Sequence, residues 1–491
     1  MQKSHRRIGV IDIGSNSVRL VIFSISGKAM FPVFNEKVMA GLGTGLGETG
    51  KLSPGGRLLA MAALARFRAI LKALGVTEVR AVATAAVRVA ADGAEFAAEA
   101  AEAAGVDLDI LSGIDEGRIS AEGVVSGFYS PDGVIGDLGG SSLELFCVGE
   151  REDVLDGETH MLGPLALEDI ATAPEKKIRS HVRAVLSASS QVQAGHRTVY
   201  AVGGAWRGFA KVSMAIEDYP LRVLHGYSMT PAQVKRTTAL VQSKRDTSEL
   251  SSIAGRRHVQ LHLTSIVLDE LVRACKAERV LISSYGLREG VVAEMMNGSE
   301  GEPLIDGAIA FASLTRYQEA FGEQLMSFTR PVFEGREPVI GDWARESRLH
   351  RAACLLSDAS GKYHPDHRHE MAFEQALYSP MSNIDHTGRA FLAASLAWRY
   401  SRSFTYPKSM SGLLSSKQQK RARQLGQAMR LGCVFSGRSA DILKFAQLEV
   451  MGGRLVFRLD RDNAPLVSEI VERRLNHASD AMGLKPMVSL T

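Results

Sequence analysis

Hydrophobic positions in the first 300 residues fall into short apolar runs that alternate with helical patterns. Residues 8–25 contain two apolar runs around a polar turn, which predicts a β-hairpin. Residues 57–75 and 95–105 are typical of helices, and each ends at a glycine. Residues 79–90 between them have the pattern of a buried strand that leads into a helix. This alternation predicts an α/β domain.

The pattern restarts at Val134. A second predicted hairpin begins there, followed by helices around 164–193, a strand over 198–204, and a strand, glycine turn and helix over 279–296. The chain is too long for a single core, since about three domains are expected at 491 residues.

Beyond residue 305 the pattern becomes mainly helical up to about residue 435. A predicted hairpin over 448–459, around two glycines, and a helix near 465–483 complete this part. We therefore predict two similar α/β halves, residues 1–128 and 129–300, and a mainly helical third region over 301–491.

Composition narrows the class of protein. The net charge of +4 argues against a dedicated nucleic-acid-binding protein and leaves room for a local basic groove. The four cysteines are far apart and form no CxxC pair, so they favour a reducing cytoplasm over a disulfide framework or zinc site. No apolar stretch reaches the roughly 18 residues of a membrane span. We expect a cytoplasmic protein with no integral membrane contact.

Two loops repeat one another: VIDIGSNSVRLVIF begins at Val10, and VIGDLGGSSLELF begins at Val134. In the alignment Asp12 matches Asp137, and Arg19 stands opposite Glu144. The loop residues between them are Gly14, Ser15, Asn16 and Ser17 in the first copy and Gly139, Gly140, Ser141 and Ser142 in the second. An internal repeat of this kind implies duplicated domains that face each other.

The residue types in both loops indicate phosphate binding. Glycine permits a backbone in which successive N–H groups face one concavity, and such a nest attracts anions. Asp12 and Asp137 would repel a phosphate, so they fit a divalent cation or its waters. One loop alone would be compatible with an ordinary glycine-containing hairpin, and the repetition favours a function.

These loops, DIGSNSVRL (12–20) and GDLGGSSLEL (136–145), resemble the two phosphate loops of the exopolyphosphatase/guanosine pentaphosphate phosphohydrolase (Ppx/GppA) family. Four further segments resemble that family in the same order: ATAAVRVAADGAEF (83–96), LSGIDEGRISAEGV (111–124), AVGGAWRGFAK (201–211) and SSYGLREGVV (283–292). The resemblance implies two actin-like (ribonuclease H-like) domains with an interdomain cleft. A mainly helical C-terminal domain that resembles HD hydrolases, with a small strand–helix element, would follow them.

The resemblance also implies roles for single residues. Glu116 matches the glutamate that acts as general base, and Arg88 matches an arginine that reaches into the cleft. Asp12, Asp137 and Glu144 are implied to hold Mg²⁺ or another divalent cation. From residue type alone, a solvated acid in the first turn of a helix is the better explanation of Glu116. For Arg88, a surface arginine and an arginine that braces phosphate are about equally supported.

The remaining matched residues have less specific expected roles. Gly203 and Gly204 match a glycine motif at which related ATPases seat a nucleoside. Arg19 either pairs with Glu144 or touches phosphate, and Arg288 is expected to anchor its helix. Gly117 departs from the family, which often has alanine after its acidic pair.

The C-terminal region is expected to lack catalytic activity, because the His-Asp pair of HD hydrolases is replaced by Ser357-Asp358. A basic stretch at Lys417, Lys420, Arg421 and Arg423 is either a track for a polyanion or a solvated helix face.

Together these observations predict an exopolyphosphatase that releases orthophosphate from polyphosphate ends. The alternative substrate is guanosine pentaphosphate (pppGpp). An actin-fold kinase or ATPase and a non-enzymatic polyanion-binding regulator remain as other classes. A homodimer is an open hypothesis.

Overall fold

The computed structural model describes residues 6–149, 154–193, 195–244, 248–255, 258–296, 298–312 and 316–491. It divides into two compact units. The first is Met1–Ser26 with Met30–Glu300, and the second is Gly27–Ala29 with Gly301–Thr491.

The first unit contains two sheets. One has the strand order β3-β2-β1-β4-β5, and the other has the order β10-β11-β9-β6-β7-β8. The strands are β1 (Arg6–Ile13), β2 (Val18–Ser26), β3 (Ala29–Val38), β4 (Glu78–Ala83), β5 (Leu108–Ile110), β6 (Gly133–Leu138), β7 (Leu143–Val148), β8 (Val154–His160), β9 (Thr198–Val202), β10 (Ser228–Met229) and β11 (Arg279–Ile282).

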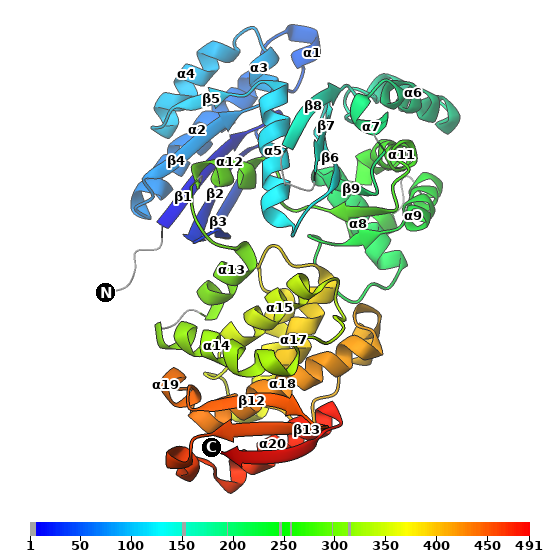
Figure 1. Cartoon of the computed structure of the whole chain (residues 1–491). Coiled ribbons are helices and arrows are strands. Elements are labelled where there is room, and N and C mark those ends of the chain that lie inside the picture. Colours follow the sequence, from blue (N-terminus) through cyan, green and yellow to red (C-terminus); the bar gives the residue numbers. More distant parts are fainter. Residues whose placement is uncertain are drawn as a thin grey trace. The chain divides into compact units, whose positions relative to one another are not determined.

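Helices of the first unit cover these sheets (Figure 1). They are α1 (Leu46–Thr49), α2 (Pro54–Ala73), α3 (Ala85–Val89), α4 (Gly93–Ala104), α5 (Gly113–Gly127), α6 (Glu175–Ser187), α7 (Ser190–Gln193), α8 (Gly204–Ile216), α9 (Pro231–Ser243), α10 (Ser248–Ala254), α11 (His258–Ala274) and α12 (Leu287–Met295). The predicted hairpins, and the helices over 57–75 and 95–105, are confirmed. The edge strands β3 and β8 were not predicted.

Helix α5 joins the two sheets. Its Ile119 packs in one core with strand residues of the first sheet, such as Val10. Its Val124 packs in another core with Ile135 of the second sheet. Helix α12 also packs on the first sheet, through Val291 and Val292, although it follows the second sheet in sequence. The division into residues 1–128 and 129–300 remains a prediction.

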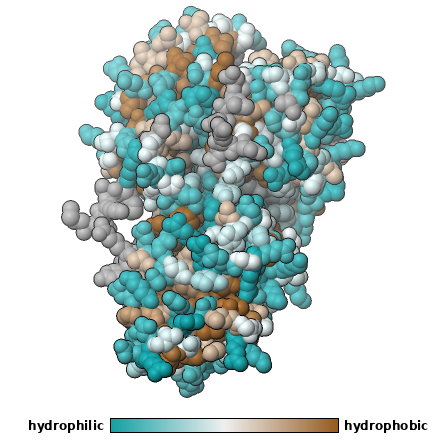
Figure 2. Space-filling model, in the orientation of Figure 1, coloured by the Kyte–Doolittle hydropathy of each residue, from teal (hydrophilic) through white to brown (hydrophobic). Residues whose placement is uncertain are grey.

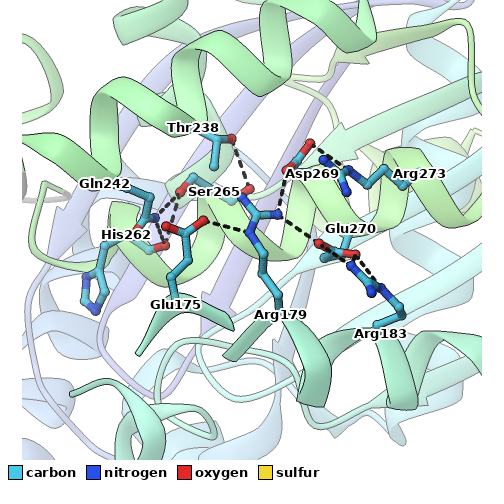
Figure 3. A network of polar contacts seen from close by, with 10 residues as sticks. All are labelled: Glu175, Arg179, Arg183, Thr238, Gln242, His262, Ser265, Asp269, Glu270 and Arg273. Atoms are coloured by element: carbon cyan, nitrogen blue, oxygen red, sulfur yellow. Dashed lines mark hydrogen bonds and ion pairs between the residues drawn. The ribbon is translucent and has the colours of Figure 1, made fainter. Parts of the chain in front are cut away.

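Buried acids attach α6 to α11 at the edge of the second half (Figure 3). The side chains of Asp269 and Glu270 are only 4% and 2% exposed. Arg179 contacts them at 2.6 and 2.8 Å, and Arg183 contacts Glu270 at 3.1 Å. Burial by itself would raise the pKa of Glu270, but hydrogen bonds from Arg183 and Arg179 outweigh it and lower that pKa.

The second unit is mainly helical, as predicted. Its helices are α13 (Pro303–Ala312), α14 (Arg316–Thr329), α15 (Trp343–Leu355), α16 (Arg368–Tyr378), α17 (His386–Tyr400), α18 (Ser416–Ser436), α19 (Ala440–Leu443) and α20 (Glu469–Met482). The predicted hairpin is β12 (Ala446–Met451) and β13 (Arg454–Leu459), and β14 (Lys485–Leu490) adds a parallel third strand that was not predicted.

Hydrophilic residues dominate the face shown in Figure 2, with hydrophobic patches between them. Exposed large hydrophobic side chains are distributed along the chain, from Val33 to Leu490. Within the described part of the chain, no helix combines the length and the apolar character that crossing a bilayer requires.

Candidate active site

The site is built at the carboxyl ends of parallel strands, which meet at one edge of a sheet. In the first sheet β1, β4 and β5 are parallel. Asp12 is the last residue but one of β1, Arg88 lies in α3 directly after β4, and Glu116 lies in the first turn of α5 after β5. The strand order therefore gathers these three side chains, which lie up to 104 positions apart in sequence.

The second sheet repeats this arrangement. Strands β6, β9 and β11 are parallel. Asp137 ends β6, Arg207 lies in α8 after β9, and Arg288 lies in α12 after β11. Arg288 approaches Asp12 of the first sheet at 3.7 Å, so residues of both sheets contribute to one site.

The two predicted loops have the same backbone. Asp12 pairs with Arg19 across the first hairpin, and Asp137 pairs with Glu144 across the second. The amide of Gly14 donates to the carbonyl of Ser17 at 3.0 Å, and that of Gly139 donates to Ser142 at 2.9 Å. These contacts confirm the sequence alignment of the two hairpins.

A supporting loop holds each copy in place, and the sequence analysis missed both. In the first half the amides of Gly41 and Gly43 donate to the carbonyls of Asn16 and Ser15. In the second half the amides of Gly163 and Leu165 donate to Ser141 and Gly140, the aligned positions. The two supporting loops share the pattern Gly-x-Gly or Gly-x-Leu, which is too short to stand out in sequence.

The structure corrects the explanation of the glycines in the two phosphate loops, which the sequence analysis attributed to an unusual backbone conformation. None of Gly14, Gly139 and Gly140 is among the glycines with positive φ. The loops therefore do not need the left-handed conformation that favours glycine. Because the supporting loops occupy the carbonyls, the hydrogen bonds of those loops give the phosphate loops their shape.

Glu116 lies inside the site and is only partly exposed. Ser112 caps α5 by accepting from the amide of Asp115 at 3.0 Å. Arg88 contacts the Glu116 carboxylate at 3.1 Å and donates to the Leu111 carbonyl at 2.6 Å. Burial raises the pKa of Glu116 to about 7; Arg88 opposes this rise, and the charges of Asp137 and Asp12 add to it.

Packing against β7 leaves room only for a glycine at position 117. A Cβ at this position would lie 2.2 Å from the ring of Phe146 and 3.1 Å from the Cβ of Glu144. The first turn of α5 therefore rests directly on β7, beside Glu144. This close approach leaves no room for the alanine that the resemblance would imply at this position.

Asp137 is half-buried and Glu144 is buried, and the two are paired across β6 and β7. Burial raises the pKa of Asp137, although the Ser120 hydroxyl donates a hydrogen bond to it and Arg207 and Arg288 lie nearby. Burial and the charge of Asp137 raise the pKa of Glu144 to about 8, although the Ser142 hydroxyl donates to it. Each of the two acids destabilises the ionised form of the other.

Two arginines make contacts that the sequence did not predict. Arg19 donates from Nε to Asn35 at 2.8 Å, and no ion pair joins it to Glu144 within the described ranges. Burial, Arg288 and Arg207 lower its pKa to about 10. Arg288, expected to anchor a helix, instead reaches Asp12. The position of Arg288 directly after a strand and glycine turn was the signal that could have identified it.

A divalent cation fits this set of donors. Buried carboxylates with raised pKa values are stabilised in the ionised form by a cation, and oxygen ligands are those that Mg²⁺ prefers. Within the part of the chain that the structure describes, no group of three His, Cys, Asp or Glu is arranged to hold a metal. The predicted triad of Asp12, Asp137 and Glu144 is thus not preassembled. Mg²⁺ commonly binds through one or two carboxylates together with substrate phosphates.

Gly203 lies at the end of β9, with a φ of 112°, at the start of α8. A Cβ there would come within 2.4 Å of the Leu138 carbonyl oxygen. This close approach to β6 accounts for Gly203 by packing. The expectation that Gly203 and Gly204 seat a nucleoside remains a prediction.

The second unit places its predicted residues differently. Asp358 contacts Arg438 at 2.9 Å and Arg399 at 3.4 Å, and the absence of catalytic activity in this region stays a prediction. Arg421 is 8% exposed, pairs with Glu346 and donates to the Glu337 carbonyl. Arg421 is therefore a core residue and is removed from the predicted polyanion track, while Lys417, Lys420 and Arg423 of that track are exposed.

The two sheets and their repeated loops give the first unit a mixed α/β fold. Its fold matches that of the Ppx/GppA family member from Aquifex aeolicus, with a TM-score of 0.54, 23% identity, and coverage of 60% of this chain and 99% of that one. An exopolyphosphatase from Cytophaga hutchinsonii matches with a TM-score of 0.53 and 21% identity, over 60% and 99% of the two chains.

The chain belongs to the Ppx/GppA phosphatase family, whose model matches residues 21–299. Residues 307–488 match the model described as exopolyphosphatase, C-terminal. Exopolyphosphatase 1 of Mycobacterium leprae is 26% identical over 62% of this chain and 94% of its own length. The guanosine-5'-triphosphate,3'-diphosphate pyrophosphatase of Vibrio cholerae is 24% identical over 70% and 71%. Family membership supports the hydrolysis of a phosphoanhydride, and relatives of both names match.

Proposed function

We propose that this protein hydrolyses the terminal phosphoanhydride bond of inorganic polyphosphate and releases orthophosphate. The observation that carries the proposal is Glu116. Its carboxylate is held by Arg88 at 3.1 Å, and burial with the charges of Asp137 and Asp12 raises its pKa to about 7. A general base works best when its pKa lies near the operating pH.

Each group has one role in the proposed reaction. Glu116 accepts a proton from a water whose oxygen attacks the terminal phosphorus; the bond to the bridging oxygen breaks, and the shortened chain leaves with the electron pair. Arg88 holds Glu116 in place. Arg19 and Arg288 face the anionic substrate, and the loop amides bind its oxygens. Mg²⁺ or another divalent cation, when bound by Asp12 or Asp137, neutralises phosphate charge.

The alternative substrate is pppGpp, which carries the same type of terminal bond. The match to the Vibrio cholerae relative favours this alternative, and the match to the Mycobacterium leprae relative favours polyphosphate. Residues 307–488 match a C-terminal exopolyphosphatase model, and for this reason we propose polyphosphate as the preferred substrate.

The direct test is a comparison of both substrates with the purified full-length chain and Mg²⁺. We expect phosphate release from long-chain polyphosphate, with Glu116→Gln slowing it at least 100-fold. Asp115→Asn, a change to the exposed neighbouring acid, is the matched control and should stay within a few-fold of the unmodified chain. Hydrolysis of pppGpp with polyphosphate untouched would replace the first substrate with the second.

A further inference from the structure

A small pocket in the second unit lies apart from every residue used above except Arg423. Trp398, Arg402, Arg423, Gln427, His477 and Asp480 line it. They come from α17, the segment after it, α18 and α20, and α18 packs against both other helices (Figure 1). The pocket has about 220 Å³ of empty space, part of it open to solvent.

Cationic groups surround this pocket. Arg402 and Arg423 line it directly, and the Arg423 guanidinium lies 5.0 Å above the Trp398 ring. Arg474 lies against the lining, with Nη1 3.5 Å from Nδ1 of His477. Asp480 is the single acidic side chain among the described lining residues. The positive charge is therefore not balanced by the residues of the pocket.

Two arginines at this place have unused donors. Nη1 of Arg430 and Nε of Arg474 are shielded from solvent and have no hydrogen-bond partner within the described residues. A buried donor without a partner costs about 1–3 kcal/mol. An anion that came within reach would remove part of this cost, whereas another cation would add to it.

The pKa values of His477 and Arg430 also indicate an excess of positive charge around the pocket. Burial, Arg402, Arg474 and Arg430 lower the pKa of His477, and Asp480 opposes them only in part. Burial, Arg474 and Arg399 lower the pKa of Arg430 to about 10. Positive groups from α18, α20 and the segment after α17 thus act on one another at close range.

We propose that this pocket binds a phosphate group. The ligand is inorganic phosphate or one phosphate of a larger phosphorylated molecule, including polyphosphate. Several guanidiniums match the oxygens of such a group in pairs, which a single lysine would not do. This binding does not depend on the proposed hydrolysis, because none of its residues belongs to the first unit.

Tryptophan fluorescence of the full-length chain gives a direct test. Inorganic phosphate is titrated at constant ionic strength, since screening alone weakens surface charges. We expect a saturable change in emission that Trp398→Phe removes, while Trp206 and Trp343 remain as internal references. Arg402→Gln and Arg423→Gln, both exposed side chains, should each weaken binding about tenfold. Arg461→Gln, another exposed arginine of the second unit, is the matched control and should bind as the unmodified chain does.

The source of the phosphate is identified by repeating the titration with long-chain polyphosphate in the Glu116→Gln chain. Tighter binding of polyphosphate than of inorganic phosphate would name the polymer as the ligand, and equal or weaker binding would name the free ion. Retention of the signal in Trp398→Phe, or unchanged affinity in both arginine variants, would overturn the proposal. Because emission is read without turnover, these results stand whether or not the chain hydrolyses polyphosphate.

Discussion

The loop after β1 and the loop after β6 share a backbone and differ in charge. Both place an aspartate at the end of a strand, and both are held by a supporting loop through two aligned hydrogen bonds. Opposite Asp12 stands Arg19, whereas opposite Asp137 stands Glu144. Asp12 has Arg288 at 3.7 Å, while Asp137 and Glu144 share a buried environment that raises the pKa of each.

We propose that this difference gives the two loops different tasks. The side with Asp137 and Glu144 would favour a cation, and the side on which Arg288 approaches Asp12 would favour the substrate anion. The two loops share one frame and differ in residue type at the position paired with the aspartate. The following changes test that separation, from the largest expected effect to the smallest.

Asp137→Asn should weaken Mg²⁺ binding about 10–100-fold, the range seen when groups that support a metal site are removed. Asp12→Asn should weaken it less than tenfold, because Arg288 already offsets the Asp12 charge. The measurement is the Mg²⁺ concentration that gives half-maximal phosphate release for each variant, with calorimetric Mg²⁺ titration beside it. Equal losses in the two variants would show that the loops share the cation evenly.

Gly163→Ala should reduce kcat/KM about 10–100-fold. Its Cβ would lie 2.4 Å from the backbone carbon of Ser141, so the second phosphate loop must move, and displacement by about 1 Å can cost about 100-fold. Gly41, at the aligned position, has a φ of 67° and would bring its Cβ 3.1 Å from the Thr44 side chain. Gly41→Ala should cost about 1–2 kcal/mol of stability from its conformation and less activity. Steady-state kinetics and thermal unfolding of both variants separate the two effects, and a more active Gly163→Ala than Gly41→Ala would contradict this account.

Arg19→Gln should raise KM for the anionic substrate about tenfold with a smaller change in kcat, since a charge-assisted hydrogen bond contributes about 1.5–3 kcal/mol. Arg66→Gln is the control: Arg66 is an exposed arginine of the same half that pairs with Glu36. Initial rates over a range of polyphosphate concentrations measure both parameters. A fall in kcat at unchanged KM would assign Arg19 to the chemical step instead of binding.

The two halves of the first unit also differ in the ion pairs of their outer helices. Changes to these ion pairs should have the smallest effects. In the first half Arg57 pairs with Asp92, Glu95 and Glu99, of which the two glutamates are largely exposed. In the second half Glu270 is buried against two arginines (Figure 3). Glu270→Gln should lower the stability of the first unit by about 1–3 kcal/mol, and Arg57→Gln by less than about 1 kcal/mol.

The pH dependence of this difference follows from the lowered pKa of Glu270. Its stabilisation is complete above the pKa of an unfolded glutamate, about 4.3, and is lost as the pH falls through the lower folded value. Urea unfolding at pH 7 and at pH 3.5 should show the Glu270→Gln deficit shrinking at the lower pH. A deficit that is the same at both would assign the effect to packing.

Sequence patterns anticipated the elements better than the contacts between them. The duplicated hairpins, the carboxylates at their strand ends and the helical second unit all followed from periodicity and the internal repeat, because these are local properties. Arg288 and the supporting loops at Gly41 and Gly163 were missed, because strand order alone brings them to the site. Arg421 was placed on a basic surface because its neighbours in sequence are charged; it is buried instead because Glu346, 75 positions earlier, faces it.

By itself, the sequence determined that two related loops carry glycine, hydroxyl and carboxylate groups at fixed spacing, and which family they resemble. The tertiary structure decided which charges meet. The packing of strands and helices buried Glu116 and Glu144 near Asp137, and burial together with the charge of Asp137 raises the pKa of each. Helix packing in the second unit gathered four arginines around His477. Electrostatic interactions depend on distance and burial, and both are set only when the strands and helices pack together.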